Sequence, residues 1–174
     1  MTLAFFQNCF VIFRNDQTFH IVFASKMKRD YRISPSMIGA KAQSSMLWSY
    51  NDSSVIIPFD DSAPLKVSAD QCHNLTLCLW YISPLISLND PTGVKYALLG
   101  EWNKWTAVSQ QRFTSIVTDT TKNEATVTVA GVAGETVPVV VFHSVLLALT
   151  VNCPISSANG QAQLVITPSN VVCS

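Results

Sequence analysis

The C-terminal third of the chain constrains the fold most, because it is a series of short apolar segments separated by turn residues. From about Thr114 to Ser174, Val- and Thr-rich segments alternate with turns such as Gly131 to Gly134 and Asn159-Gly160. Apolar side chains at every second position are typical of strands with one buried face. Many short strands, with no helical periodicity between them, predict an all-β fold: an antiparallel two-sheet β-sandwich of Greek-key or jelly-roll type.

The rest of the chain continues this pattern. Two apolar runs, residues 9–13 and 19–24, flank the turn signal Asn15-Asp16 and predict a hairpin. Pro138 lies inside a run that we expect to be a strand, and it predicts an edge strand or a bulge there. Further strands are expected over residues 46–50, 54–59, 65–68, 75–82, 94–99, 112–118, 125–129, 136–142, 145–151 and 163–167.

A basic run and a loop-like stretch divide the N-terminal hairpin from the later strands. Residues 26–32 contain two lysines and two arginines, and a Ser/Pro/Gly/Ala-rich stretch continues to Ser45. Such composition is typical of a loop or linker, and a short basic run is most simply a solvated loop. We therefore expect residues 1–45 to form an N-terminal hairpin and loop extension, and residues 46–174 to form the sandwich domain.

Low charge is the main compositional feature. Of 174 residues, 48% are hydrophobic and only 13% are charged, with a formal net charge of zero. A hydrophobic, uncharged chain is not disordered, and it has no field that favours nucleic acid or an anionic membrane. The composition fits an extracellular β-protein or one face of a larger assembly, and predicts poor solubility for the isolated chain.

Signals for localisation point to the secretory pathway. Two glycosylation sequons begin at Asn51 and Asn74. Residues 3–6 are apolar but too short for a signal peptide or a membrane span. We therefore expect a secreted protein, and we expect that Met1 is not the true start and that a longer polypeptide precedes it.

The cysteines allow two interpretations. There are five, and an odd number leaves at least one free if the others pair. Cys153 and Cys173 lie at the two ends of an expected hairpin over residues 151–171. Because the ends of a hairpin approach each other, we expect these two cysteines to form a disulfide. Cys72 and Cys78 are expected on one strand, too far apart to bond. The alternative is that all five are buried thiols.

The only dense aromatic cluster offers a candidate carbohydrate site. Trp102, Asn103, Lys104 and Trp105 stand together in one segment. Indole faces can stack on sugar rings, while amide and ammonium groups bind hydroxyls. Tryptophans at the rim of a sandwich also close its open end by packing, and we favour packing over sugar binding here.

No catalytic constellation is visible. Asp60-Asp61 is the only adjacent carboxylate pair, and its neighbourhood is typical of a solvated turn. Glu101 adjoins Trp102 but has no partner that the sequence identifies. His143-Ser144 lies in an apolar run without a nucleophile elbow.

Metal and cofactor sites are likewise not predicted. Cys72-His73 and Cys78 lack the spacing of zinc ligands, and no second ligand pair follows. The chain has no phosphate-binding loop and no dinucleotide-binding glycine pattern. We therefore expect neither a metal nor a cofactor.

One stretch resembles a known family. Residues 77–85 read Leu-Cys-Leu-Trp-Tyr-Ile-Ser-Pro-Leu, and residues 98–105 read Leu-Leu-Gly-Glu-Trp-Asn-Lys-Trp. These motifs, and the later 127–131 and 134–137, are similar to the C-terminal β-domain of raffinose-synthase-like and α-galactosidase-like glycoside hydrolases. The resemblance covers about residues 46–151.

The resemblance implies an accessory role. In that family the catalytic aspartates lie in an upstream barrel, which this chain does not contain, so no catalytic residue carries over. It implies a β-domain that buttresses a barrel, with that barrel or an oligosaccharide as partner and no nucleic acid or membrane partner. Two alternatives stay open: a free-standing carbohydrate-binding module, and a structural, coat-like assembly protein.

Overall fold

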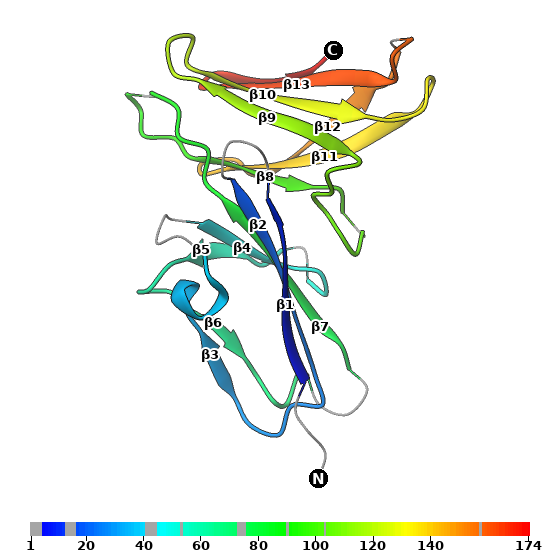
Figure 1. Cartoon of the computed structure of the whole chain (residues 1–174). Helices are drawn as coiled ribbons and strands as arrows, with labels where there is room; N and C mark the ends of the chain where they lie inside the picture. The colour runs from blue at the N-terminus through cyan, green and yellow to red at the C-terminus, as the bar shows by residue number, and fades with distance from the viewer. Residues whose placement is uncertain are drawn as a thin grey trace. The chain divides into compact units, whose positions relative to one another are not determined.

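The protein is all-β, as the sequence predicts. The computed structural model describes residues 5–12, 17–40, 45–52, 54–72, 76–89, 91–102, 104–156 and 158–174, with the backbone alone for 5–12. Strands hold 52% of the residues and helix 3%, and antiparallel sheets pack against each other. The strands (Figure 1) are β1 (Phe5–Ile12), β2 (Thr18–Ser25), β3 (Tyr31–Ile33), β4 (Ser45–Ser49), β5 (Ile56–Phe59), β6 (Leu65–Val67), β7 (Cys78–Pro84), β8 (Tyr96–Gly100), β9 (Phe113–Asp119), β10 (Glu124–Ala130), β11 (Thr136–His143), β12 (Leu147–Pro154), β13 (Gln161–Thr167) and β14 (Asn170–Cys173).

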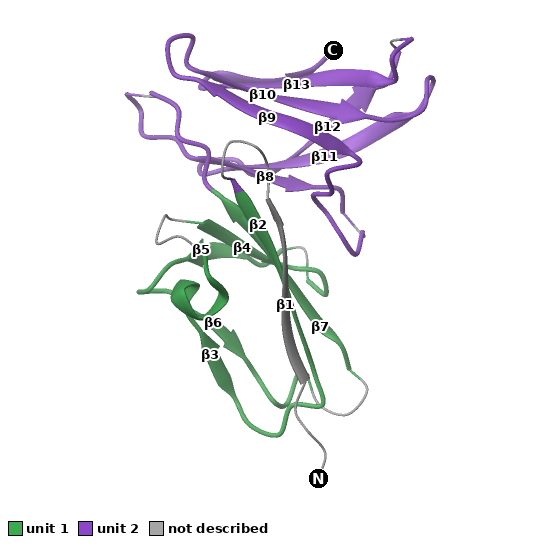
Figure 2. Cartoon of the chain, in the orientation of Figure 1, with its two compact units in different colours: residues 1–10, 18–84 green, residues 11–17, 85–174 purple. Residues whose placement is uncertain are grey.

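The chain forms two compact units (Figure 2). Unit 1 comprises residues 1–10 and 18–84, and unit 2 comprises residues 11–17 and 85–174. The division after Pro84 differs from the boundary at 45/46 that we expected. The reason is strand pairing: β2 is hydrogen-bonded to β7, and β3 to β6, so these two strands belong to unit 1.

Unit 1 packs a five-stranded antiparallel sheet, in the order β1-β2-β7-β4-β5, against the two-stranded ribbon β3-β6. Register places alternate residues on one face, since Val22 pairs with Trp80 and Leu47 pairs with Ile82. These side chains meet the ribbon in a common core. Its buried members are Val22, Ala24, Met27, Ile33, Ile38, Leu47, Phe59, Leu65, Val67, Cys72, Cys78, Trp80 and Ile82.

The loop expected over residues 26–45 contains regular structure. It includes β3 and the 3-10 helix η1 (Pro35–Ile38), which begins with a proline at its first turn. Ile33 and Ile38 are buried in the core of unit 1 and anchor the segment. Elements of three or four residues are too short to produce a periodic pattern, so the sequence did not reveal them.

Unit 2 is a sandwich of the sheets β12-β11-β8 and β14-β13-β10-β9. Alternation is clearest in β10, where Ala125, Val127 and Val129 are fully buried between partly exposed threonines. β11 is the central strand of its sheet, whereas Pro138 led us to expect an edge strand or a bulge; the pairing of β11 with β8 does shift register between Val140 and Val141. β8, however, pairs with β11 only from Val140 onwards, so Pro138 lies where β11 has β12 as its one neighbour.

The expected hairpin over residues 151–171 is instead a crossover between the two sheets of unit 2. β12 pairs with β11, whereas β13 pairs with β10 and β14. Gly160 adopts φ 68° in the connecting turn. A disulfide joins Cys153 of β12 to Cys173 of β14, with their Cα atoms 5.1 Å apart. The bridge predicted from hairpin geometry is therefore a link from one sheet to the other.

Candidate functional site

Unit 1 contains an open groove with a volume of about 820 Å³. It lies beside the core, bordered by the face of the large sheet and by the β3-β6 ribbon. Its size is in the range of small-molecule sites, about 300–1,000 Å³. The residues that line the groove are Arg32, Leu47, Ser49, Asn51, Asp52, Val55, Ile57, Pro58, Ser62, Ala63, Pro64, Leu65, Lys66, Gln71, Thr76, Cys78 and Trp80.

The floor of the groove is apolar because it continues the core face of the large sheet. Leu47 of β4 pairs with Ile57 of β5, and both line the groove. β5 is the edge strand, so the floor opens toward solvent and Ile57 is 43% exposed. Trp80 also lines the floor but is only 8% exposed, so its indole is a wall of packed carbon rather than a free platform.

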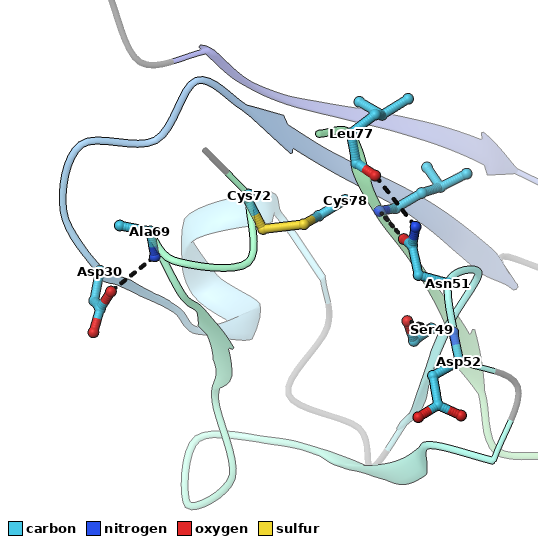
Figure 3. Close-up of a disulfide and its surroundings, with 9 residues drawn as sticks. Asp30, Ser49, Asn51, Asp52, Ala69, Cys72, Leu77 and Cys78 are labelled. Carbon is cyan, nitrogen blue, oxygen red and sulfur yellow. Dashed lines mark hydrogen bonds between the residues drawn. A yellow bond between two sulfur atoms is a disulfide. The ribbon is translucent and has the colours of Figure 1, made fainter. Parts of the chain in front are cut away.

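One side of the groove is the turn between β4 and β5, which is fixed by side-chain hydrogen bonds. Asn51 donates from Nδ2 to the carbonyl of Leu77 (3.4 Å) and accepts at Oδ1 from the N–H of Leu79 (3.3 Å) (Figure 3). Asp52 Oδ1 accepts from the backbone N–H and the hydroxyl of Ser54. These bonds to Ser54 lower the pKa of Asp52, so its carboxylate is ionised at neutral pH.

The segment after β6 is fixed by a disulfide between Cys72 and Cys78, with their Cα atoms 5.5 Å apart. Our expectation that these cysteines could not bond was wrong. Cys72 is not on the strand: its N–H donates to the carbonyl of Ser68 in a turn that brings it back to the start of β7. Asp30 accepts from the N–H of Ala69 and holds the same turn to β3 (Figure 3).

Two cations border the groove side by side. Arg32 of β3 and Lys66 of β6 are directly opposite each other in register, and both are exposed. Both line the groove, and no carboxylate of the described residues forms an ion pair with either. Like charges directly opposite each other destabilise a strand pair, so this arrangement has a cost in the free protein. Sequence reasoning treated Arg32 as part of a solvated loop and did not single out Lys66.

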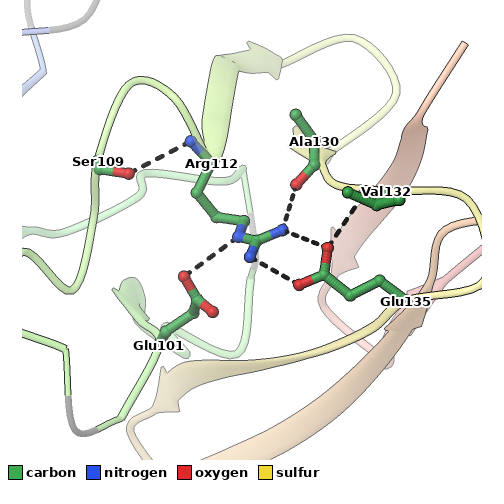
Figure 4. Close-up of polar contacts among 6 residues, drawn as sticks. All are labelled: Glu101, Ser109, Arg112, Ala130, Val132 and Glu135. Atoms are coloured by element: carbon green, nitrogen blue, oxygen red, sulfur yellow. Dashed lines mark hydrogen bonds and ion pairs between the residues drawn. The ribbon is translucent and has the colours of Figure 1, made fainter.

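A second polar cluster, in unit 2, is centred on Arg112 (Figure 4). Its guanidinium donates to Glu135 through two nitrogens, at 2.7 and 3.1 Å, and to Glu101 at 3.2 Å. It also donates to the carbonyl of Ala130 at 2.6 Å, and Glu135 accepts from the N–H of Val132. Glu101, which had no identifiable partner in the sequence, is therefore paired with Arg112.

This cluster is suited to holding the fold and not to proton transfer. The hydrogen bond from Arg112 lowers the pKa of Glu135, and the same bond raises the pKa of Arg112. Both carboxylates share one permanently charged partner, and the lowered pKa of Glu135 keeps that carboxylate ionised at neutral pH. The cluster joins the end of β10 and the turn after it to the segment that precedes β9. Gly100, beside it, has φ 88° and lies against the carbonyl of Ala107, where a Cβ would collide.

The residues predicted as a carbohydrate platform belong to unit 2. Trp105 is 64% exposed, Trp102 is half-buried and Lys104 is exposed. Asn103 lies outside the described residues. The platform stays a prediction. The two glycosylation sites also stay predictions. Asn51 is exposed and borders the groove, and Asn74 lies outside the described residues.

The candidate catalytic and metal groups do not assemble in the described part of the chain. No three His, Cys, Asp or Glu side chains there are grouped to hold a metal ion. Asp60 accepts from the N–H groups of Ser62 and Ala63, which makes the Asp60-Asp61 pair part of a turn. The described residues also contain no helix with the length and apolarity that a membrane crossing requires.

An apolar turn projects from unit 2 between β11 and β12. Val145, Leu146 and Leu147 are 69%, 60% and 61% exposed. The turn is held by His143, whose Nδ1 accepts from the N–H groups of Val145 and Leu146 at 3.1 and 3.2 Å. Three consecutive exposed apolar residues favour association in solution.

Comparisons with protein-family models, with curated proteins and with solved structures return no match. The resemblance to the β-domain of glycoside hydrolases is neither supported nor opposed by them, and stays a prediction.

Proposed function

We propose that this protein is a non-catalytic carbohydrate-binding protein, and that the unit 1 groove holds the oligosaccharide. One observation carries the proposal: an open groove of about 820 Å³ joins an apolar floor to hydrogen-bonding side chains from three separate segments. Ligand sites combine these two features, because an apolar wall removes the apolar faces of the ligand from water and a few polar groups fix the orientation of the ligand.

The chemistry of the groove fits sugars in particular. A pyranose ring presents C–H faces and many hydroxyls that both donate and accept. Ile57, which is 43% exposed, and the half-buried Val55 offer carbon for the former. Gln71 and Thr76 offer amide and hydroxyl groups for the latter. The groups that form the turn beside them, Asn51 above all, are engaged with the backbone and give the groove a fixed shape without a ligand.

A secretory location belongs to the same proposal. Two disulfides, Cys72–Cys78 and Cys153–Cys173, close loops in units 1 and 2. Disulfides persist in oxidising compartments and are rare in the cytosol. Peptide mapping of protein isolated from its native source, without reductant, is expected to recover both linked peptides; free thiols at all four positions would contradict this location.

The binding proposal is tested by calorimetric titration of the purified chain with a panel of neutral and acidic oligosaccharides. Thr76 is exposed and borders the groove, so Thr76→Trp should obstruct it and abolish binding. Thr150→Trp adds the same bulk at an exposed position of β12 in unit 2 and should leave binding unchanged. Trp105→Ala should also leave it unchanged. Binding that survives Thr76→Trp but is lost in Trp105→Ala would overturn the groove in favour of the tryptophan segment.

A further inference from the structure

We propose that the unit 1 groove selects anionic oligosaccharides, those that carry carboxylate or sulfate groups, and that Arg32 and Lys66 bind the anion. This inference rests on the proposed function and assigns the class of sugar. The two cations occupy facing positions of the β3-β6 ribbon and border the groove together.

This pair of cations destabilises the ribbon of the free protein. Two like charges directly opposite each other on a ribbon repel, and opposite charges at the same positions would stabilise it. No described carboxylate forms an ion pair with either cation. An oxyanion placed between Arg32 and Lys66 converts the repulsion into two attractions. The planar fork of Arg also matches the two oxygens of a carboxylate or sulfate.

A carboxylate in the lining of the same groove narrows the ligand class. Asp52 borders the groove from the β4–β5 turn, and its hydrogen bonds with Ser54 keep it ionised. A uniformly anionic polymer, such as a nucleic acid or a polyglutamate, would place negative charge against this carboxylate. A sugar that carries one anionic group per residue, with hydroxyls elsewhere, suits both kinds of charge: its anion meets the cations and its hydroxyls donate to Asp52.

The test compares charged and neutral ligands on the full chain. The probe is a hexamer of galacturonate, which carries one carboxylate per residue, with cellohexaose as neutral comparator and hexaglutamate as anionic non-sugar. Titrations are run at low and high salt, since exposed charges are screened. The variant is Arg32→Gln with Lys66→Gln. The matched control is Lys28→Gln, which removes an exposed cation of unit 1 outside the groove lining.

We expect an acidic hexasaccharide to bind, cellohexaose to bind more weakly, and salt to weaken only the former. The double variant should lose about 5- to 30-fold in affinity for the acidic sugar, at about 0.5–1 kcal/mol for each exposed pair, and keep its affinity for cellohexaose. Lys28→Gln should bind like the wild type.

Four results would overturn the inference. Equal affinity for the neutral and acidic sugars, or an unchanged double variant, removes anion selection but leaves carbohydrate binding intact. Equal affinity for hexaglutamate removes the sugar class. If no oligosaccharide binds, the proposed function itself fails, and with it this inference.

Discussion

The disulfide that joins the two sheets of unit 2 should stabilise its unit more than the disulfide of unit 1 stabilises unit 1. Cys153–Cys173 closes a loop with a sequence separation of 20, and Cys72–Cys78 one of 6. With the loop-closure relation, in which the entropy lost by the unfolded chain grows with the logarithm of loop length, removal costs about 3 kcal/mol for the first and about 2 kcal/mol for the second. Both costs refer to the unfolding free energy of the unit concerned.

The measurement is urea unfolding followed by circular dichroism, in a Cys9→Ala background that prevents thiol exchange. Replacement of Cys153 and Cys173 by alanine should lower the midpoint by about 1–3 M urea, since the slope for small proteins is about 1–3 kcal/mol/M. The matched comparison removes Cys72 and Cys78 in the same way. The larger loss should fall on the transition of unit 2.

Two results would refute this reasoning. A loss below about 1 kcal/mol for the inter-sheet bridge would mean that the unfolded chain is not constrained as the loop-length relation requires. Cys72 and Cys153 are both fully buried, so packing around the sulfurs also contributes to stability. A larger loss of unfolding free energy on removal of the unit 1 disulfide would mean that this packing, and not loop closure, determines the effect. Chemical reduction of the unsubstituted chain provides a check without any change of side chain.

Three further predictions concern unit 2. Arg112→Met should cost about 1–2 kcal/mol of unfolding free energy at pH 7, because charge-assisted hydrogen bonds at a partly exposed site are lost. The folded-state pKa of Glu135 lies below its ordinary value, so the stability that the Arg112–Glu135 pair adds is full above the ordinary value and is lost as the pH falls through the folded-state pKa. Urea midpoints of the wild type and Arg112→Met that stay equally far apart in acid would refute this. Gly100→Ala should cost more than about 2 kcal/mol, because φ is 88° and the new Cβ collides with Ala107; an unchanged melting temperature would contradict this. Leu146→Ser should raise the highest protein concentration at which light scattering still shows one monodisperse species. Scattering identical to that of the wild type would exclude the apolar turn as the cause of association.

The sequence predicted the strands well where alternation was long enough to see. β10 and β11 match the expected segments closely, because each is at least seven residues long and has a buried face. β3, at three residues, and η1, at four, were missed, since they are held by tertiary packing of Ile33 and Ile38 and not by local pattern.

The candidate site could not be predicted for a different reason. Arg32 and Lys66 are distant in the chain, and only the register of the β3-β6 ribbon brings them together. The pairing of Cys72 with Cys78 also depended on a turn that the pattern did not reveal. Glu101 was noticed, but its partner Arg112 is identified only when the chain folds back on itself. Pairwise geometry of this kind is absent from a single sequence.

Mapping the sugar contact residue by residue would show whether the unit 1 groove binds carbohydrate. The measurement is a nuclear magnetic resonance titration of the isotope-labelled chain with the galacturonate hexamer. We expect saturable shifts of backbone amides at Arg32, Lys66 and Gln71, which border the groove. Shifts confined to the segment around Trp105, or no shifts at saturating sugar, would contradict it.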